Sequence, residues 1–193
     1  MASQAIWVPG YVAVAEHVGG GGGGSDGPLK NYDGGPLGNV PQHDYQDIVG
    51  YRQGFGIRFR GKANQQVWFH FAIPTPVILE NNRASLQRAF VMWRTDPNPF
   101  FPATLSSFHV WDGARAQLFQ RDGLGLFGPF DGSSFQAGTD PKLVEGANMF
   151  TLEQPQVIYY GVGISVLIAF GSQNDDTDVV FSSAGADFIT QAS

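Results

Sequence analysis

The sequence predicts a single all-β domain, an antiparallel β-sandwich of about 8–9 strands with a jelly-roll-like arrangement. Apolar and polar residues alternate with a period of two wherever the chain shows a pattern, as in strands with one buried face. The 193 residues include 26 Gly and 12 Pro, which favours many turns. The chain also lacks a helical stripe long enough to fold as an amphipathic helix. A closed barrel is the alternative, and the sequence leaves both open.

The composition fits a protein with a large core and few charges. Hydrophobic residues make up 42% of the chain and charged residues 15%, below the typical share of about 25%. The net charge is −6 and the 11 Lys and Arg are scattered, so we expect no nucleic-acid partner. Apolar runs are shorter than the roughly 18 residues of a membrane span, and none is predicted.

The compartment is predicted from the absence of Cys and of a leader. Without Cys the chain has no disulfide framework and no thiolate metal site. The first residues lack the basic start and apolar stretch of a secretory signal. A cytoplasmic location is therefore the default expectation, and release without a leader is compatible with the same features.

The N-terminal part is predicted as one strand followed by a long loop. Ala5–His17 reads as a strand with a bend at Pro9–Gly10. Residues 18–50 form a Gly/Pro-rich stretch with six consecutive glycines, Gly19–Gly24. Such a composition is typical of a flexible linker, but one preceding strand is too little to fold alone. We therefore interpret 18–50 as a surface loop within a single domain spanning 1–193.

The next two strands are predicted at Tyr51–Arg60 and Gln66–Ile73. The first places Tyr51, Gln53, Phe55, Ile57 and Phe59 on one face. The second places Val67, Phe69, Phe71 and Ile73 on one face, with Trp68 and His70 on the other. A hairpin through Lys62–Asn64 is expected to join the two strands.

Further strands are predicted in the second half of the chain. Leu86–Thr95 is one strand, and Asp112–Gly113 is a type I′ hairpin signal between Phe108–Trp111 and Ala114–Phe119. Asn148–Glu153 is expected to pair with Val157–Phe170 across Gln154–Pro155, and Asp178–Phe188 completes the set. In Val157–Phe170, apolar residues alternate with a face of small residues that includes Gly163 and Ser165.

Several segments together carry a resemblance to a known family. They are Ile6–Val8, Gly54–Phe59, Trp68–Ile78, Val110–Gly113, Gly161–Val166 and Ala184–Phe188. With these segments the chain resembles a family of small, mostly bacterial β-proteins that is a domain of unknown function. The resemblance covers most of the chain outside the Gly-rich stretch and the region around Phe100. It implies a single β domain and implies no catalytic residue.

Gly123–Gly128 has the G-x-G-x-x-G spacing of a dinucleotide-binding turn. That chemistry needs a strand before the motif and a helix after it, whose N-terminus faces the pyrophosphate. Pro129 follows the motif at once and Gly132 comes soon after, so no helix is expected there. We predict a turn-rich loop without nucleotide binding.

Two Trp–His pairs are the candidate ligand-binding residues, namely Trp68 with His70 and Trp111 with His109. Each His shares a strand face with its Trp, and the two His could be neighbours across a sheet. Aromatic rings on the polar face of a strand can stack on sugars or anchor an interface. The alternative is that another sheet, the long loop or a partner chain covers this face.

Asp175, Asp176 and Asp178 are candidate calcium ligands between two strands. Calcium prefers clustered oxygen ligands, although the spacing of an EF-hand is absent. A solvated turn whose charges protect strand edges is the simpler interpretation. Calcium is therefore a possible cofactor, and no other cofactor is expected.

The predicted function is a non-enzymatic β-sandwich that binds a partner or self-associates as a structural module. Its expected partners are a second copy of the chain or another protein. A lectin-like carbohydrate-binding protein, with calcium assistance through the three Asp, is the alternative. An enzyme with a dispersed site at His70 or at paired acids ranks last, because no nucleophile motif is visible.

Overall fold

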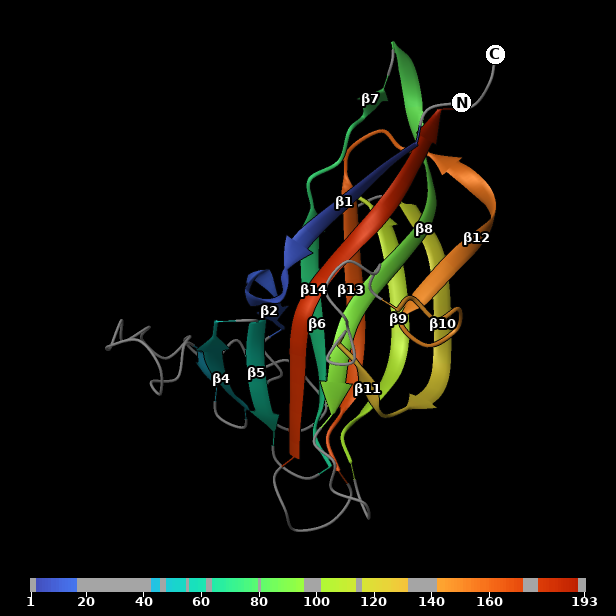
Figure 1. The fold of residues 1–193 in the computed structure, drawn as a ribbon. Coiled ribbons are helices and arrows are strands. Elements are labelled where there is room, and N and C mark those ends of the chain that lie inside the picture. The colour runs from blue at the N-terminus through green and yellow to red at the C-terminus, as the bar shows by residue number, and fades with distance from the viewer. Residues whose placement is uncertain are drawn as a thin grey trace.

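The computed structural model describes residues 3–16, 43–45, 48–54, 56–61, 64–79, 81–95, 102–113, 116–131, 142–171 and 177–190. In this part of the chain, two antiparallel β-sheets face each other, and the single helical segment is the short 3₁₀ turn η1 (Gly10–Val12). The predicted all-β sandwich is confirmed, and Figure 1 shows its two layers. Jelly-roll connectivity stays a prediction.

The larger sheet has nine described strands, in the order β11-β8-β14-β5-β4-β3, with β1 added to β14 and with β12 and β7 added to β8. Their bounds are β1 (Ser3–Pro9), β3 (His43–Tyr45), β4 (Ile48–Gln53), β5 (Gly56–Gly61), β7 (Ile78–Leu79), β8 (Asn82–Thr95), β11 (Pro129–Phe130), β12 (Met149–Val157) and β14 (Thr177–Thr190). The long strands β8 and β14 form its centre, and we call it the nine-stranded sheet.

The smaller sheet has five described strands in the order β10-β9-β13-β6-β2, and we call it the five-stranded sheet. Their bounds are β2 (Val14–Ala15), β6 (Gln66–Ile73), β9 (Thr104–Asp112), β10 (Ala116–Leu126) and β13 (Val162–Ala169). The central strand β13 pairs along its whole length with β6 on one side and β9 on the other. This sheet carries the candidate site.

Aromatic rings from both sheets fill the space between them. Phe59 of the nine-stranded sheet and Phe69 of the five-stranded sheet have ring centroids 4.6 Å apart. Phe181 lies 5.1 Å from Phe69 and 5.3 Å from Phe71, and all four rings are buried. Burying a Phe side chain contributes about 1.5–3 kcal/mol, so this cluster is a major source of stability.

The predicted strand Tyr51–Arg60 is wrong, because the chain reverses within it. Gln53 pairs with Gly56, so β4 and β5 form a hairpin with a two-residue connection. Residues that pair across the hairpin share a face of the sheet. Each pair joins an odd-numbered and an even-numbered residue, so the odd-numbered residues of β5 share a face with the even-numbered residues of β4. Ile57 is buried as predicted, but its partner in β4 is Arg52 and not a residue of Tyr51's face.

Two predicted pairings are also wrong, for one physical reason. The predicted hairpin at Lys62–Asn64 would pair β5 with β6, and residues 148–153 would pair with 157–170. The structure instead places each of these neighbours in opposite sheets. Successive strands with one apolar face can bury it by packing face to face across the core, and this leaves their edges to other strands. Strand β12 accordingly pairs with β8.

Other strand predictions hold with changed bounds. Gln66–Ile73 is confirmed with its predicted buried face, and β8 and β14 extend beyond their predicted ends. The N-terminal bend is the 3₁₀ turn η1. In the predicted loop 18–50, β3 and the start of β4 are strands, and residues 18–42 lie outside the described residues. The described strands, fourteen in all, exceed the predicted number, because four of them span three residues or fewer and the predicted strand 51–60 is divided into β4 and β5.

The hairpin at Asp112–Gly113 is confirmed, but its turn differs from the prediction. Asp112 pairs with Ala116, so three residues connect β9 and β10, and Gly113 has a positive φ of 58°. Gly123–Gly128 lies at the end of β10 and just beyond it, where the predicted loop is largely strand. Within the described residues, no helix is both long and apolar enough to cross a membrane.

Candidate functional site

The outer face of the five-stranded sheet brings together the candidate residues from β6 and β9. Ser165 of β13 pairs with His70 of β6 on one side and with His109 of β9 on the other. Their neighbours Phe69 and Phe108 are buried toward the core. Because side chains alternate along a strand, His70, Ser165 and His109 lie in one row on the outer side.

Three rings form a continuous line across this face, which we call the aromatic strip: Trp68, His109 and Trp111. The ring centroids of Trp68 and His109 are 4.7 Å apart, and those of His109 and Trp111 are 6.3 Å apart. Trp68 stands opposite Leu167, and Trp111 stands opposite Gly163. The strip therefore runs obliquely over β13, with all three rings partly exposed.

Each imidazole beside or within the strip is held by polar contacts. His70 contacts the Ser165 hydroxyl through Nδ1 at 2.9 Å and the Glu16 carboxylate through Nε2 at 3.5 Å. His109 contacts Oδ1 of Asp122 through Nε2 at 2.8 Å. These contacts fix the orientation of both rings, so the strip is ordered before any ligand arrives.

Asp122 is a permanent negative charge at the rim of the strip. Hydrogen bonds from His109, Gln120 and Ser107, with the largest effect from His109, lower the pKa of Asp122 to about 2. The side chain is half exposed. It is therefore ionised at any pH above this value, including neutral pH.

Gly163 leaves open space beside Trp111 at one end of the strip. A Cβ placed on Gly163 would meet no atom within 4 Å. Its strand neighbours across the two ladders are Ala72 and Trp111, so a small side chain lies on one side and an indole ring on the other. The unfilled space over the Gly163 backbone leaves room for a flat group to stack against the Trp111 ring.

The four residues predicted from the sequence, Trp68, His70, His109 and Trp111, all lie on this one face. Sequence reasoning missed the acids that contact the imidazoles, Glu16 and Asp122, because both come from other strands or strand ends. Ser165 and Gly163 were visible only as members of the small face of their strand. The register of β13 against β6 and β9 places Ser165 beside His70 and His109, and the sequence carried no signal for that register.

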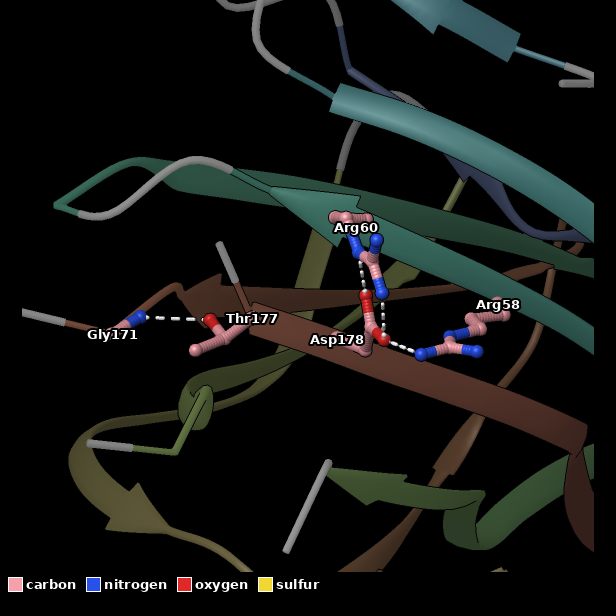
Figure 2. Close-up of polar contacts among 5 residues, drawn as sticks. All are labelled: Arg58, Arg60, Gly171, Thr177 and Asp178. Atoms are coloured by element: carbon pink, nitrogen blue, oxygen red, sulfur yellow. Dashed lines mark hydrogen bonds and ion pairs between the residues drawn. The ribbon is translucent and has the colours of Figure 1, made fainter. Parts of the chain in front are cut away.

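The calcium candidates do not join this face. Asp175 and Asp176 lie outside the described residues. Asp178 is buried at the start of β14, where Arg60 donates to its carboxylate at 2.8 and 3.1 Å and Arg58 donates to it as well (Figure 2). Two guanidinium groups thus occupy both oxygens of Asp178. Among the described residues, no three His, Asp or Glu gather as metal ligands.

The neighbouring Thr177 fixes the start of the same strand. Its hydroxyl oxygen accepts a hydrogen bond from the Gly171 backbone N–H at 2.9 Å, as Figure 2 also shows. Thr177 itself is buried. These contacts make the Asp178 region part of the fold's framework at the start of the central strand β14.

Ser165, His70 and Glu16 contact one another in the order of a hydrolase triad, but their setting differs from one. Acyl transfer needs N–H donors aimed at the oxyanion that forms beside the serine. The backbone N–H groups around Ser165 are used in the ladders that β13 makes with β6 and β9. A central strand alternates its N–H groups between its two neighbours, so none is left to face a substrate.

Comparison with known proteins adds no relative to these observations. No family model, no curated protein and no solved structure matches the chain. The resemblance to a family of uncharacterised β-proteins stays a prediction.

Proposed function

We propose that the protein is a non-enzymatic binding module that holds a carbohydrate on the aromatic strip. The observation that carries the proposal is the continuous line of Trp68, His109 and Trp111, all partly exposed on one outer sheet face. The C–H face of a sugar ring is apolar, and aromatic rings offer it a large, rigid contact area. Two Trp rings with a connecting imidazole suit successive sugar units better than one isolated contact.

Polar groups next to the rings supply the hydrogen bonds that a sugar needs. Gln120 is exposed in the same row as His109 and offers its amide oxygen as an acceptor. The half-exposed carboxylates of Glu16 and Asp122 offer further acceptor oxygens. Gly163 leaves room for a ring to stack on Trp111. Apolar stacking combined with several hydroxyl partners is the usual chemistry of a specific small-ligand site.

The polarity of the face supports a glycan over a self-association surface. The centre of a stable protein–protein interface is depleted of charge. Here the carboxylates of Glu16 and Asp122 contact the imidazoles on either side of Ser165 and remain half exposed. A second copy packed on this face would have to desolvate both carboxylates, whereas a bound sugar chain leaves their outer sides in water.

A glycan array followed by titration calorimetry tests the proposal. We expect the wild type to bind a glycan and Trp111→Ala to abolish this binding. Gly163→Val should weaken it by about ten-fold or more, since the added side chain fills the space beside Trp111. Phe127→Ala removes an exposed ring outside the strip and serves as the matched control. Unchanged binding in Trp111→Ala and Gly163→Val would move the site elsewhere.

Two further outcomes decide between the alternatives. The array is run once with calcium and once with a chelator, and we expect the same signal, because both oxygens of Asp178 already accept from arginines. The array could instead show no glycan binding under either condition, while light scattering shows a dimer that Trp111→Ala dissociates. This result would replace the carbohydrate proposal by self-association.

A further inference from the structure

A groove of about 360 Å³ hollows the side of the sandwich next to the aromatic strip. One wall is Leu118–Arg121 of β10, and the other is formed by residues of β12 between Leu152 and Gln156. In the described part of the chain, the strand paired with β10 is β9 and the strand paired with β12 is β8. A further bridge joins Met149 of β12 to Glu145, outside the residues that line the groove. The groove therefore lies between free edges of the two sheets.

Both strands depart from regular pairing where they line the groove. The register of β10 shifts between Gln117 and Phe119, so Leu118 is an additional residue. The register of β12 against β8 breaks between Thr151 and Gln156. Within that break, Pro155 has no N–H to donate to a ladder. Such bulges bend strands at sheet edges and often lie beside binding sites.

The lining combines an apolar base with amide groups at the rim. Leu152 is buried and Phe119 is partly buried, while Gln154 and Gln156 are exposed. Each glutamine amide carries two donors and one acceptor, which can pair with neighbouring hydroxyl groups of a sugar. An apolar base with an amide rim can contact both the C–H groups and the hydroxyl groups of a sugar.

The charges at this groove balance each other. Arg121 lies on β10 with its guanidinium 4.9 Å from the centroid of the Phe119 ring, and Glu153 faces the groove from β12. One positive and one negative group leave no net charge to attract an ion. The groove therefore suits an uncharged ligand.

Gln120 connects the groove to the aromatic strip. It pairs with His109 across the ladder between β9 and β10, and its amide donates to Asp122. The same Gln120 lines the groove. A chain that stacks on Trp68 and His109 and continues across the strands would next meet Gln120 and then the groove.

We infer that the groove is the second subsite for the same carbohydrate, so that the ligand is an uncharged polysaccharide long enough to span the strip and the groove. The inference rests on the proposed function of the strip. An extended peptide could instead add to the free edge of β10, but the continuity through Gln120 favours one chain over two unrelated ligands.

Chain length is the measurement that tests this inference. Neutral glucan, mannan and xylan oligosaccharides of two and of six sugars are immobilised and titrated with the wild-type protein and with the Gln154→Ala/Gln156→Ala double variant. For each series that binds, we expect the six-sugar chain to bind about ten-fold more tightly than the two-sugar chain. The double variant should lose this advantage and keep its affinity for two sugars. Gln4→Ala, which changes an exposed glutamine of β1, is the matched control.

The other outcomes separate the two proposals. If the six-sugar advantage is absent, or if it persists in the double variant, the groove is not a subsite, while binding at the strip stands. If none of the three series binds in either length, both the groove and the carbohydrate function are rejected. Circular dichroism of each variant confirms that the fold is retained, since the substituted glutamines are exposed.

Discussion

The carboxylate of Asp112 accepts a hydrogen bond from the backbone N–H of Tyr160 at 2.8 Å. The same carboxylate accepts from Tyr159 at 2.8 Å and from Gly161 at 2.9 Å. Asp112 ends β9, and the three donors belong to the segment that carries the chain from β12 to β13, from one sheet to the other. One buried carboxylate thus fixes a crossing between the two layers of the sandwich.

This arrangement predicts an acid-sensitive contribution of Asp112 to stability. Burial alone would raise the pKa of Asp112, but the N–H donors of Gly161, Tyr159 and Tyr160 outweigh it, so the pKa lies below its ordinary value. The pKa of an aspartate in an unfolded chain is about 3.9. The contribution is therefore complete above about pH 4 and is lost as the pH falls through the folded-state pKa.

Asp112→Asn tests that contribution by urea unfolding at pH 7 and at pH 3. The amide keeps one acceptor oxygen, so we expect a loss of about 1–2 kcal/mol at pH 7. The variant should then lose less stability than the wild type between the two pH values. Equal losses on acidification in both proteins would show that the carboxylate charge of Asp112 does not contribute.

Gly56 and Gly163 predict opposite effects of the same substitution. A Cβ on Gly56 would overlap the backbone carbonyl of Phe181, which belongs to the central strand β14, whereas Gly163 has open space. Gly56→Ala should therefore destabilise the protein by about 2–4 kcal/mol. Gly163→Ala should be neutral or stabilising by up to about 1 kcal/mol, since glycine weakens a strand. The midpoint of urea unfolding measures both, and similar losses would contradict the packing around Gly56.

How far the sequence could predict this fold is visible in β6. Its bounds and its buried face follow from a local alternation of Val67, Phe69 and Phe71 with polar neighbours, and they are confirmed. Its partners are not local. Strand β6 pairs with β13, about a hundred residues away in the chain. Strands that are close in sequence can pack their apolar faces against each other across the core, and their partners within a sheet then come from elsewhere in the chain.

For the candidate site, too, the sequence predicts some of the residues but not the contacts between them. Trp68 and His109 could be predicted from the sequence, because each is polar or amphipathic at a position flanked by core residues. The contacts that give them a chemical setting could not. The pair of His109 and Asp122 depends on the register of β10, which bulges and so departs from simple counting. Cross-strand partners require the register, and register is a tertiary property.

Asp178 gives a prediction on calcium. Its carboxylate is buried and already holds Arg58 and Arg60. A cation would have to displace two guanidinium groups, so added calcium should leave the Tm of the wild type unchanged. Asp178→Asn should lower the Tm, since it leaves both arginines without their anion. A rise in Tm with calcium that a chelator reverses, and that Asp178→Asn removes, would restore Asp178 as a calcium ligand.

Asp122 gives the final prediction, on the charge of the ligand. Its pKa of about 2 keeps the carboxylate ionised at neutral pH, and Glu16 adds a second carboxylate near the opposite imidazole, His70. Uronic acid chains should therefore bind more weakly than neutral chains of the same length, and added salt should narrow the difference in affinity by screening the repulsion.

Asp122→Asn keeps the shape of the side chain and removes its charge, so it should raise the affinity for polygalacturonate relative to neutral glycans. Glu145→Gln removes an exposed carboxylate outside the strip and outside the groove lining and serves as the matched control. Affinity electrophoresis at low and high salt measures the ratio, and an unchanged preference in Asp122→Asn would show that the rim charge does not select the ligand.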